Sequence, residues 1–363
     1  MFVGHEFLAF ALAGWGASRL GGAPDTALRL GAVAALAALL PDLDVLYAAV
    51  TYAAAVAGGT PLGWEAFWGV ANGVHRVVTH PLPVGVAAAF AFGLGAVVDA
   101  RASTSGSASG SLGVIGVAAL PTALYAPVLV LSFRTAVGAA AAIVAGAFLA
   151  VVAVAGVVVG RRLRLPTTAV TAAAAVGFLT HPFGDVFLAA PPPLLSPFGP
   201  PVLTERVALA ADPTLEIFGV LFVELAAVWL GVLVALDLGR AEAVPRPQTP
   251  RFAMLRRLRD SLDRRAGVGF AYAVAVVALP RPTVVDAHIL GFTIVPLAVV
   301  VGLWASLRHR EGGLRSLPST SPLGGGAVTV GIVTGVATLT LAAIAYVVTY
   351  ELSAVGVLPV ALG

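Results

Sequence analysis

The chain contains no cysteine and no lysine, and only 11% of its 363 residues are charged. Without cysteine there can be no disulfide, no thiolate zinc site and no iron–sulfur cluster. Any bound metal must therefore be held by histidine nitrogen and carboxylate oxygen. All the basic residues are arginine, and the formal net charge is only +3, so no nucleic-acid partner is expected.

Hydrophobic residues make up 59% of the sequence, which is far above the share typical of water-soluble domains. A helix needs roughly 20 apolar residues to cross the core of a bilayer. Runs of this kind predict an all-α, polytopic bundle of about ten transmembrane helices. The expected spans lie near residues 1–18, 30–57, 82–99, 113–132, 136–160, 167–189, 214–236, 267–280, 286–306 and 326–349.

Arginine clusters predict how these spans are oriented. They lie at residues 161–164, 246–265 and 308–315, and two expected spans separate each cluster from the next. Short arginine-rich loops stay on the cytoplasmic side of a membrane. The pattern predicts a multi-pass protein of the cytoplasmic membrane, with the polar motifs described below in the outer half of the bilayer or just outside it.

The polar motifs all lie in the first part of the chain. We therefore expect a metal-binding membrane domain over residues 1–210 and a further transmembrane region over residues 211–363. The second region contains the last four of these apolar spans and a basic cytoplasmic loop at residues 240–265.

Four short motifs hold all four histidines and half of the acidic residues of the first region. Ionisable groups at membrane depth are costly, so those present usually pair, bind ions or take part in chemistry. Their concentration predicts a His/Asp metal site in the N-terminal half. The motifs are His5-Glu6, Pro41-Asp42-Leu43-Asp44, His75-Arg76-Val77-Val78-Thr79-His80 and His181-Pro182-Phe183-Gly184-Asp185.

The spacing within two motifs favours metal ligands. His181 and Asp185 are four residues apart and share one face of a helix, although Pro182 favours a break in the helix at this point. His75 and His80 are five residues apart and cannot share a face, so they need a loop before the next span. Within that loop, Arg76 and Thr79 would offer hydrogen bonds to a phosphate group.

Asp42 and Asp44 interrupt an apolar run that extends from Leu30 to Val50. Buried carboxylates do not stay charged without a partner, so either a cation lies beside them or they are protonated. An extended chain after Pro41 would point both side chains the same way, whereas a helix would direct only one to the site. We expect Asp44 to be the ligand and Asp42 to be a supporting or bridging residue.

The ordered set of motifs resembles the YdjM family of inner-membrane-associated metal-dependent hydrolases. The resemblance rests on PDLD at 41–44, HRVVTH at 75–80 and HPFGD at 181–185, and it covers roughly the first 200 residues. This family is distantly related to zinc-dependent phospholipases C and P1-type nucleases, whose metal clusters are built from His and Asp on helices. The resemblance implies six candidate metal ligands: His5, Asp44, His75, His80, His181 and Asp185.

The function expected from these observations is that of a membrane-bound metal-dependent hydrolase. Its substrate would be a phosphoester, either a small molecule or a membrane lipid with its headgroup. Two or three divalent ions, zinc first and manganese or iron as alternatives, would activate a water molecule. Glu6 or Asp42 would accept the proton.

Two other functions fit the same polar residues. A metal or ion transporter would use them as a site near the membrane midplane. A non-catalytic scaffold would use them to hold a structural metal in a closed coordination shell.

Overall fold

The computed structural model describes residues 3–71, 76–102, 111–187, 191–241, 258–277, 284–312 and 326–354. Within these residues the secondary structure consists of helices and turns, without a strand. The chain divides into two compact units, residues 1–207 and 208–363. Both units are helical, and all the polar motifs belong to the first.

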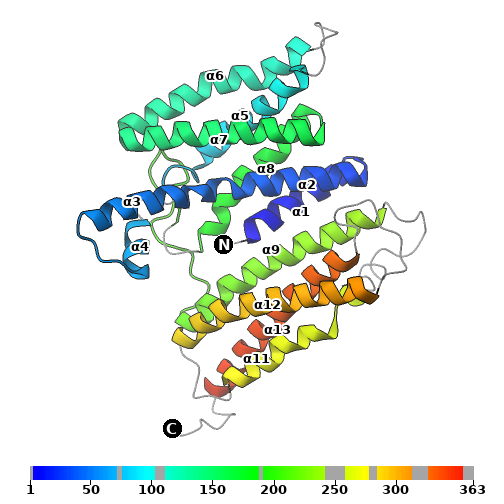
Figure 1. Cartoon of the computed structure of the whole chain (residues 1–363). Helices are drawn as coiled ribbons and strands as arrows, with labels where there is room; N and C mark the ends of the chain where they lie inside the picture. Colours follow the sequence, from blue (N-terminus) through cyan, green and yellow to red (C-terminus); the bar gives the residue numbers. More distant parts are fainter. Residues whose placement is uncertain are drawn as a thin grey trace. The chain divides into compact units, whose positions relative to one another are not determined.

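In the first unit, α5 packs against α6, α7 and α8, and α2 packs against α1 and α8 (Figure 1). The helix α8 therefore touches both groups and joins them into one core. The elements are α1 (Gly4–Arg19), α2 (Pro24–Leu39), the 3-10 helix η1 (Pro41–Asp44), α3 (Val45–Ala57), α4 (Trp64–Ala71), α5 (Leu82–Ala102), α6 (Ser111–Ala136), α7 (Ala139–Leu163) and α8 (Thr167–Asp185).

Glycines let these helices approach to backbone contact. A Cβ atom added to Gly156 of α7 would lie 2.0 Å from the carbonyl oxygen of Phe92 on α5. One added to Gly177 of α8 would lie 2.3 Å from the carbonyl oxygen of Ala34 on α2. Small residues at helix crossings are typical of membrane bundles, where association depends on close packing rather than on exclusion of water.

Two helix boundaries differ from the sequence prediction. The expected span 30–57 is interrupted by η1, because Pro41 has no N–H group with which to continue the hydrogen bonding of α2. The expected break at Pro182 does not occur, since α8 continues to Asp185. Pro182 cannot donate a hydrogen bond to the carbonyl of Phe178. The helix α5 approaches this carbonyl closely, at Gly85.

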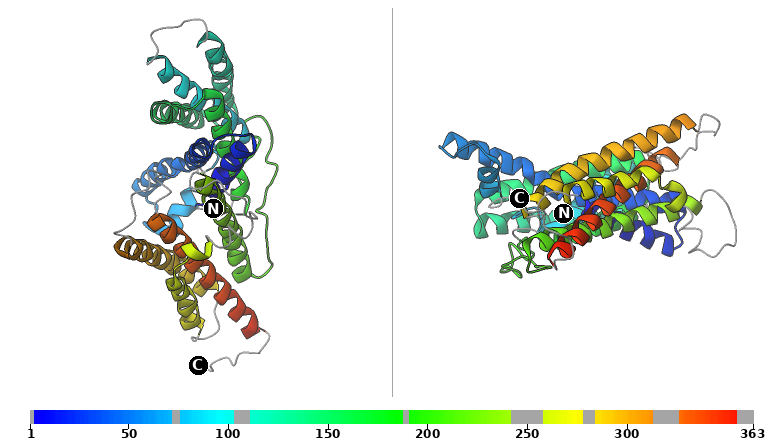
Figure 2. Two further views of the ribbon diagram at one scale, coloured as in Figure 1. Left: turned by 90° about the vertical axis from the view of Figure 1, so that its right-hand side faces the viewer. Right: turned by 90° about the horizontal axis from the view of Figure 1, so that it is seen from below.

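The second unit contains long helices that lie side by side (Figure 2). The helix α13 packs against α12, α11 and α9. Gly302 of α12 and Gly331 of α13 form a close crossing, at which an added Cβ atom would lie under 3.0 Å from the partner's carbonyl oxygen. Residues 242–257 of the expected basic loop lie outside the described residues. The elements are α9 (Pro213–Ala241), the 3-10 helix η2 (Arg264–Ala266), α11 (Gly267–Val277), α12 (Val284–Gly312) and α13 (Gly326–Ala354).

Within the described part of the chain, four helical stretches are long and apolar enough to cross a membrane: Pro24–Ala57, which includes η1, Ala139–Leu163, Pro213–Gly239 and Gly326–Leu352. Their outer faces are apolar as well: on α7, for example, Ile143 is 71% exposed. These features indicate a membrane protein. Each of the ten ranges expected from the sequence contains a helix, and their assignment as ten spans remains a prediction.

Candidate metal centre

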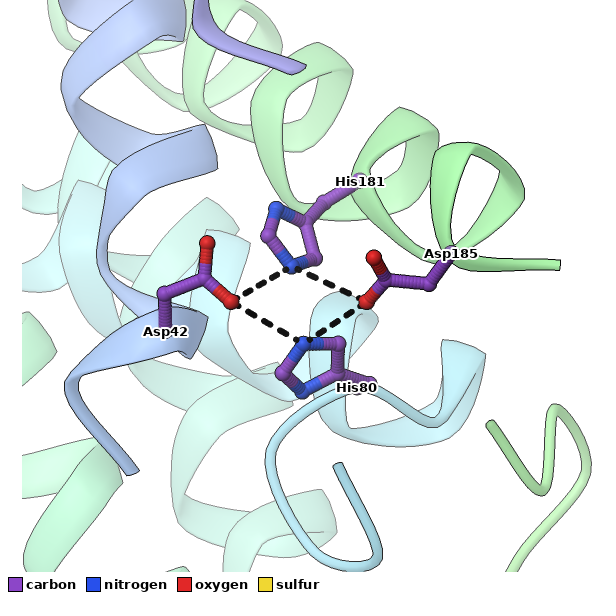
Figure 3. Close-up of side chains that lie close together, drawn as sticks. All are labelled: Asp42, His80, His181 and Asp185. Atoms are coloured by element: carbon purple, nitrogen blue, oxygen red, sulfur yellow. Dashed lines mark ion pairs between the residues drawn. The ribbon is translucent and has the colours of Figure 1, made fainter. Parts of the chain in front are cut away.

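Four side chains from three distant segments converge in the first unit (Figure 3). Each of them offers one ligand atom, and these four atoms all lie within 4.8 Å of one another. The residues are Asp42 of η1, His80 of the turn before α5, and His181 and Asp185 near the end of α8. Two imidazoles and two carboxylates in this arrangement could hold a metal ion.

The carboxylates of the group alternate with the imidazoles. The Nε2 atom of His80 lies 3.4 Å from Asp42 Oδ1 and 3.2 Å from Asp185 Oδ2. The Nε2 atom of His181 lies 3.6 Å and 3.9 Å from the same two oxygens. Each Nε2 atom thus faces both acids across one shared space, as the dashed lines in Figure 3 show.

The fold of η1 separates the two aspartates of the Pro41–Asp44 motif. In a 3-10 helix, residues two apart in sequence point in directions roughly 120° apart. Asp42 faces the two histidines, whereas Oδ2 of Asp44 accepts hydrogen bonds from the backbone N–H of Arg76 and from Oγ1 of Thr79, at 2.8 and 2.6 Å. The four-residue group therefore contains Asp42, where Asp44 was expected.

Asp44 holds the turn that carries His80. Residues 76–79 form turns, and Arg76 has a φ angle of +71°, in the left-handed region that non-glycine residues adopt only at a cost. The hydrogen bond that the Arg76 N–H donates to Asp44 stabilises this conformation. The carbonyl of Pro81 then accepts from the N–H groups of Val84 and Gly85, which begins α5 directly after His80.

Thr79 orients the ring of His80. Its hydroxyl has one proton, which it donates to Asp44, because an ionised carboxylate can only accept. The 2.9 Å contact between Thr79 Oγ1 and His80 Nδ1 then requires a proton on Nδ1. In a neutral ring, the lone pair is consequently on Nε2, the nitrogen that faces Asp42 and Asp185. Thr79 is 3% exposed, so its position fits this role rather than the expected contact with substrate.

The carboxylates around His80 favour the protonated, positively charged form of its imidazole. Burial lowers the pKa of its imidazole, but hydrogen bonds from the charged ring to Asp185 and Asp42 outweigh burial and raise the pKa to about 9. A positive charge is therefore favoured among these carboxylates at neutral pH. A bound metal cation would satisfy the same requirement.

His181 provides the clearest test of whether the residues fit a metal. Its side chain is fully buried, and among the described residues neither of its ring nitrogens makes a hydrogen bond. A buried polar atom without a hydrogen bond is costly, and coordination to a cation would satisfy the nitrogen that faces the acids. The donor set of imidazole and carboxylate is also one that zinc, manganese and iron accept.

His5 of α1 lies directly beside the group. Its ring centroid is 4.1 Å from that of His181, and its Nε2 atom is 3.4 Å from Asp185 Oδ1. Glu6, the expected proton acceptor, follows it on α1 and is not one of the four clustered residues. His75, the other expected ligand of this region, lies outside the described residues.

Arg76 also contacts the group, through its side chain. Its Nε atom lies 3.1 Å from Asp185 Oδ2. Sequence reasoning assigned Arg76 to substrate phosphate and did not identify this ion pair. The side chains of Arg76 and Asp42 are 14% and 30% exposed, whereas those of His5, Asp44, His80, His181 and Asp185 are 2% exposed or less.

Comparison of the chain with protein-family models, curated proteins and solved structures finds no match in any of the three.

Proposed function

We propose that the protein is a membrane-bound, metal-dependent hydrolase that acts on phosphoesters. The observation that carries the proposal is the cluster of Asp42, His80, His181 and Asp185 in a chain otherwise poor in charge. A membrane protein rarely retains such residues at one point without an ion or a reaction to serve. We further propose the cytoplasmic membrane as its location, with the cluster toward the outer face, from the distribution of arginine.

Zinc is the metal that we propose, with manganese and iron as alternatives, because the chain offers only nitrogen and oxygen ligands. His5 and Asp44 border the four-residue group and His75 belongs to the same motif as His80, so these residues supply donors for a second or third ion. When bound, divalent ions lower the pKa of a coordinated water and offset the charge of a phosphoryl group.

The chain's own residues have distinct tasks in this proposal. His80 and His181 offer neutral nitrogens, and Thr79 keeps the lone pair of His80 directed inward. Both contacts of Asp42 with the histidines use Oδ1, which leaves Oδ2 to accept the proton of the attacking water. Asp42 and Arg76 are the most exposed of these side chains, so substrate approaches past them.

The order of motifs in the sequence adds support for hydrolysis. PDLD, HRVVTH and HPFGD resemble the YdjM family. One residue of each motif lies in a common contact, since His80 lies close to both Asp42 and Asp185. Phospholipid headgroups are the substrate class that we propose first, since a hydrolase embedded in a bilayer meets them at high local concentration.

The test begins with elemental analysis of the protein purified in detergent. Phosphodiester, phosphomonoester and phospholipid substrates are then screened with zinc and with a chelator. Substitution His181→Ala should remove bound metal and activity together. The matched control is His309→Ala, which changes an exposed histidine of α12 and should leave both intact.

Retained hydrolysis in metal-free His181→Ala protein would contradict the proposal. Metal flux in proteoliposomes without hydrolysis of any substrate would identify a transporter instead.

A further inference from the structure

Arg76 and the proposed metal compete for one oxygen atom. Asp185 Oδ2 lies 3.1 Å from Arg76 Nε, 3.2 Å from His80 Nε2 and 3.9 Å from His181 Nε2. The oxygen that faces the two ligand nitrogens is therefore already paired with a guanidinium. A cation bound between these residues would take the same oxygen and would repel the positive charge of Arg76.

The ion pair between Arg76 and Asp185 lacks hydrogen-bond geometry at Arg76 Nε. Although Arg76 Nε is close to Asp185 Oδ2, it makes no hydrogen bond within the described part of the chain. The contact is thus attraction between charges without an aligned N–H group. The backbone of Arg76 is held separately, because its N–H group donates a hydrogen bond to Oδ2 of Asp44. The side chain can leave Asp185 without unfolding the turn that positions His80.

With neutral histidines, the formal charges of the site balance once one divalent cation is present. The carboxylates of Asp42, Asp44 and Asp185 carry three negative charges and Arg76 carries one positive charge, which leaves −2 when the histidines are neutral. One divalent ion neutralises this charge. The metal ion then offsets the charge of Asp185 in place of Arg76. The planar guanidinium of Arg76 is well suited to two parallel hydrogen bonds with a phosphate.

We propose that Arg76 is an exchangeable counter-ion, which pairs with Asp185 in the metal-free protein and turns to the anionic phosphate of the substrate once metal is bound. This inference rests on the proposed metal site and deepens it. Metal and phosphate then favour each other's binding, and by thermodynamic reciprocity each raises the affinity for the other by the same factor. In metal-free protein the guanidinium of Arg76 is held by Asp185 and is not available to substrate.

Arg76→Gln gives an unusual expected result, because changes beside a metal site normally weaken metal binding. Without the competing charge, zinc should bind about tenfold more tightly, which is the effect of a modest Coulombic term of ~1.4 kcal/mol. Affinity for inorganic phosphate in the presence of zinc should fall about tenfold. Zinc is measured by competition with a chromogenic chelator, and phosphate by titration calorimetry.

Two further variants control for charge and for the substitution itself. Arg76→Lys keeps the charge and should keep the zinc affinity, but it loses the paired hydrogen bonds to phosphate. Arg29→Gln makes the same change in an exposed ion pair with Asp25 on α2 and should alter neither affinity.

The outcomes separate this inference from the proposed function. No zinc binding by the unaltered protein would overturn both. Zinc binding that is unchanged or weaker in folded Arg76→Gln protein would overturn the role of Arg76 alone. Phosphate binding by the unaltered protein that is equally strong with zinc and with chelator would also overturn it, and this measurement requires no variant.

Discussion

Thr79→Val tests how the metal centre is held, because valine has the shape of threonine without its hydroxyl. The change removes the hydrogen bond to Asp44 at 2.6 Å and the contact with His80 Nδ1 at 2.9 Å. A buried hydrogen bond to a charged group contributes about 1.5–3 kcal/mol. Independently, loss of a residue that orients a ligand typically lowers metal affinity by about 10–100-fold.

A 10–100-fold loss of metal affinity corresponds to about 1.4–2.7 kcal/mol of binding free energy. We therefore expect Thr79→Val to bind zinc 10–100-fold more weakly while keeping its helical content. Without the hydroxyl, His80 loses the group that keeps its proton on Nδ1, and Nε2 then holds a lone pair for only part of the time. Chelator competition measures the affinity, and circular dichroism measures the helical content.

Thr79→Ser is the matched control. Serine keeps the hydroxyl and loses one buried methyl group, which reduces stability by about 0.8 kcal/mol but leaves the hydrogen bonds in place. Its zinc affinity should stay near that of the unaltered protein. If Thr79→Val also kept an unaltered zinc affinity in a folded protein, Thr79 would not orient His80 and the reasoning would be refuted.

Other positions give equally direct tests. Asp42→Asn should lower zinc affinity at least about 100-fold, because a neutral amide is a poor substitute for a ligand carboxylate. If the loss in the same chelator assay were no larger than that of Thr79→Val, Asp42 would not be a ligand. Gly156→Ala should lower the thermal unfolding temperature in detergent, since its Cβ would lie 2.0 Å from Phe92 O and overpacking costs about 1–3 kcal/mol. Gly146→Ala on the same helix, with open space around it, should not lower it. Trp229→Phe removes a 3.0 Å hydrogen bond to Thr340 and should cost the second unit about 1 kcal/mol in chemical denaturation, without any change in zinc affinity.

The sequence was sufficient to predict the helices and most of the clustered residues. Long apolar runs predict where helices lie, because every backbone polar group must be satisfied within its own segment in a bilayer, although the expected span 30–57 contains two helices, α2 and α3. His181 and Asp185 lie on one face by helical spacing alone, and the two residues do face a common space. The turn before α5 follows from Pro81, which cannot donate a backbone hydrogen bond.

The roles of Asp42, Asp44 and Thr79 could not be predicted in the same way. They depend on whether residues 41–44 form an extended segment, an α-helix or a 3-10 helix, and each alternative directs a different carboxylate to the site. The ion pair between Arg76 and Asp185 joins residues more than 100 positions apart and leaves no local pattern. The continuity of α8 through Pro182 similarly depends on its tertiary packing against α5.

The wide separation of the clustered residues along the chain has a consequence for biogenesis. Asp42 and Asp44 leave the ribosome long before His181 and Asp185, and only the later helix brings the imidazole of His181 to Asp42. The group of Asp42, His80, His181 and Asp185 is therefore complete only after the end of α8 has been synthesised. A chain that ends before residue 181 would contain Asp42 and His80 without the imidazole and the carboxylate that α8 brings to them.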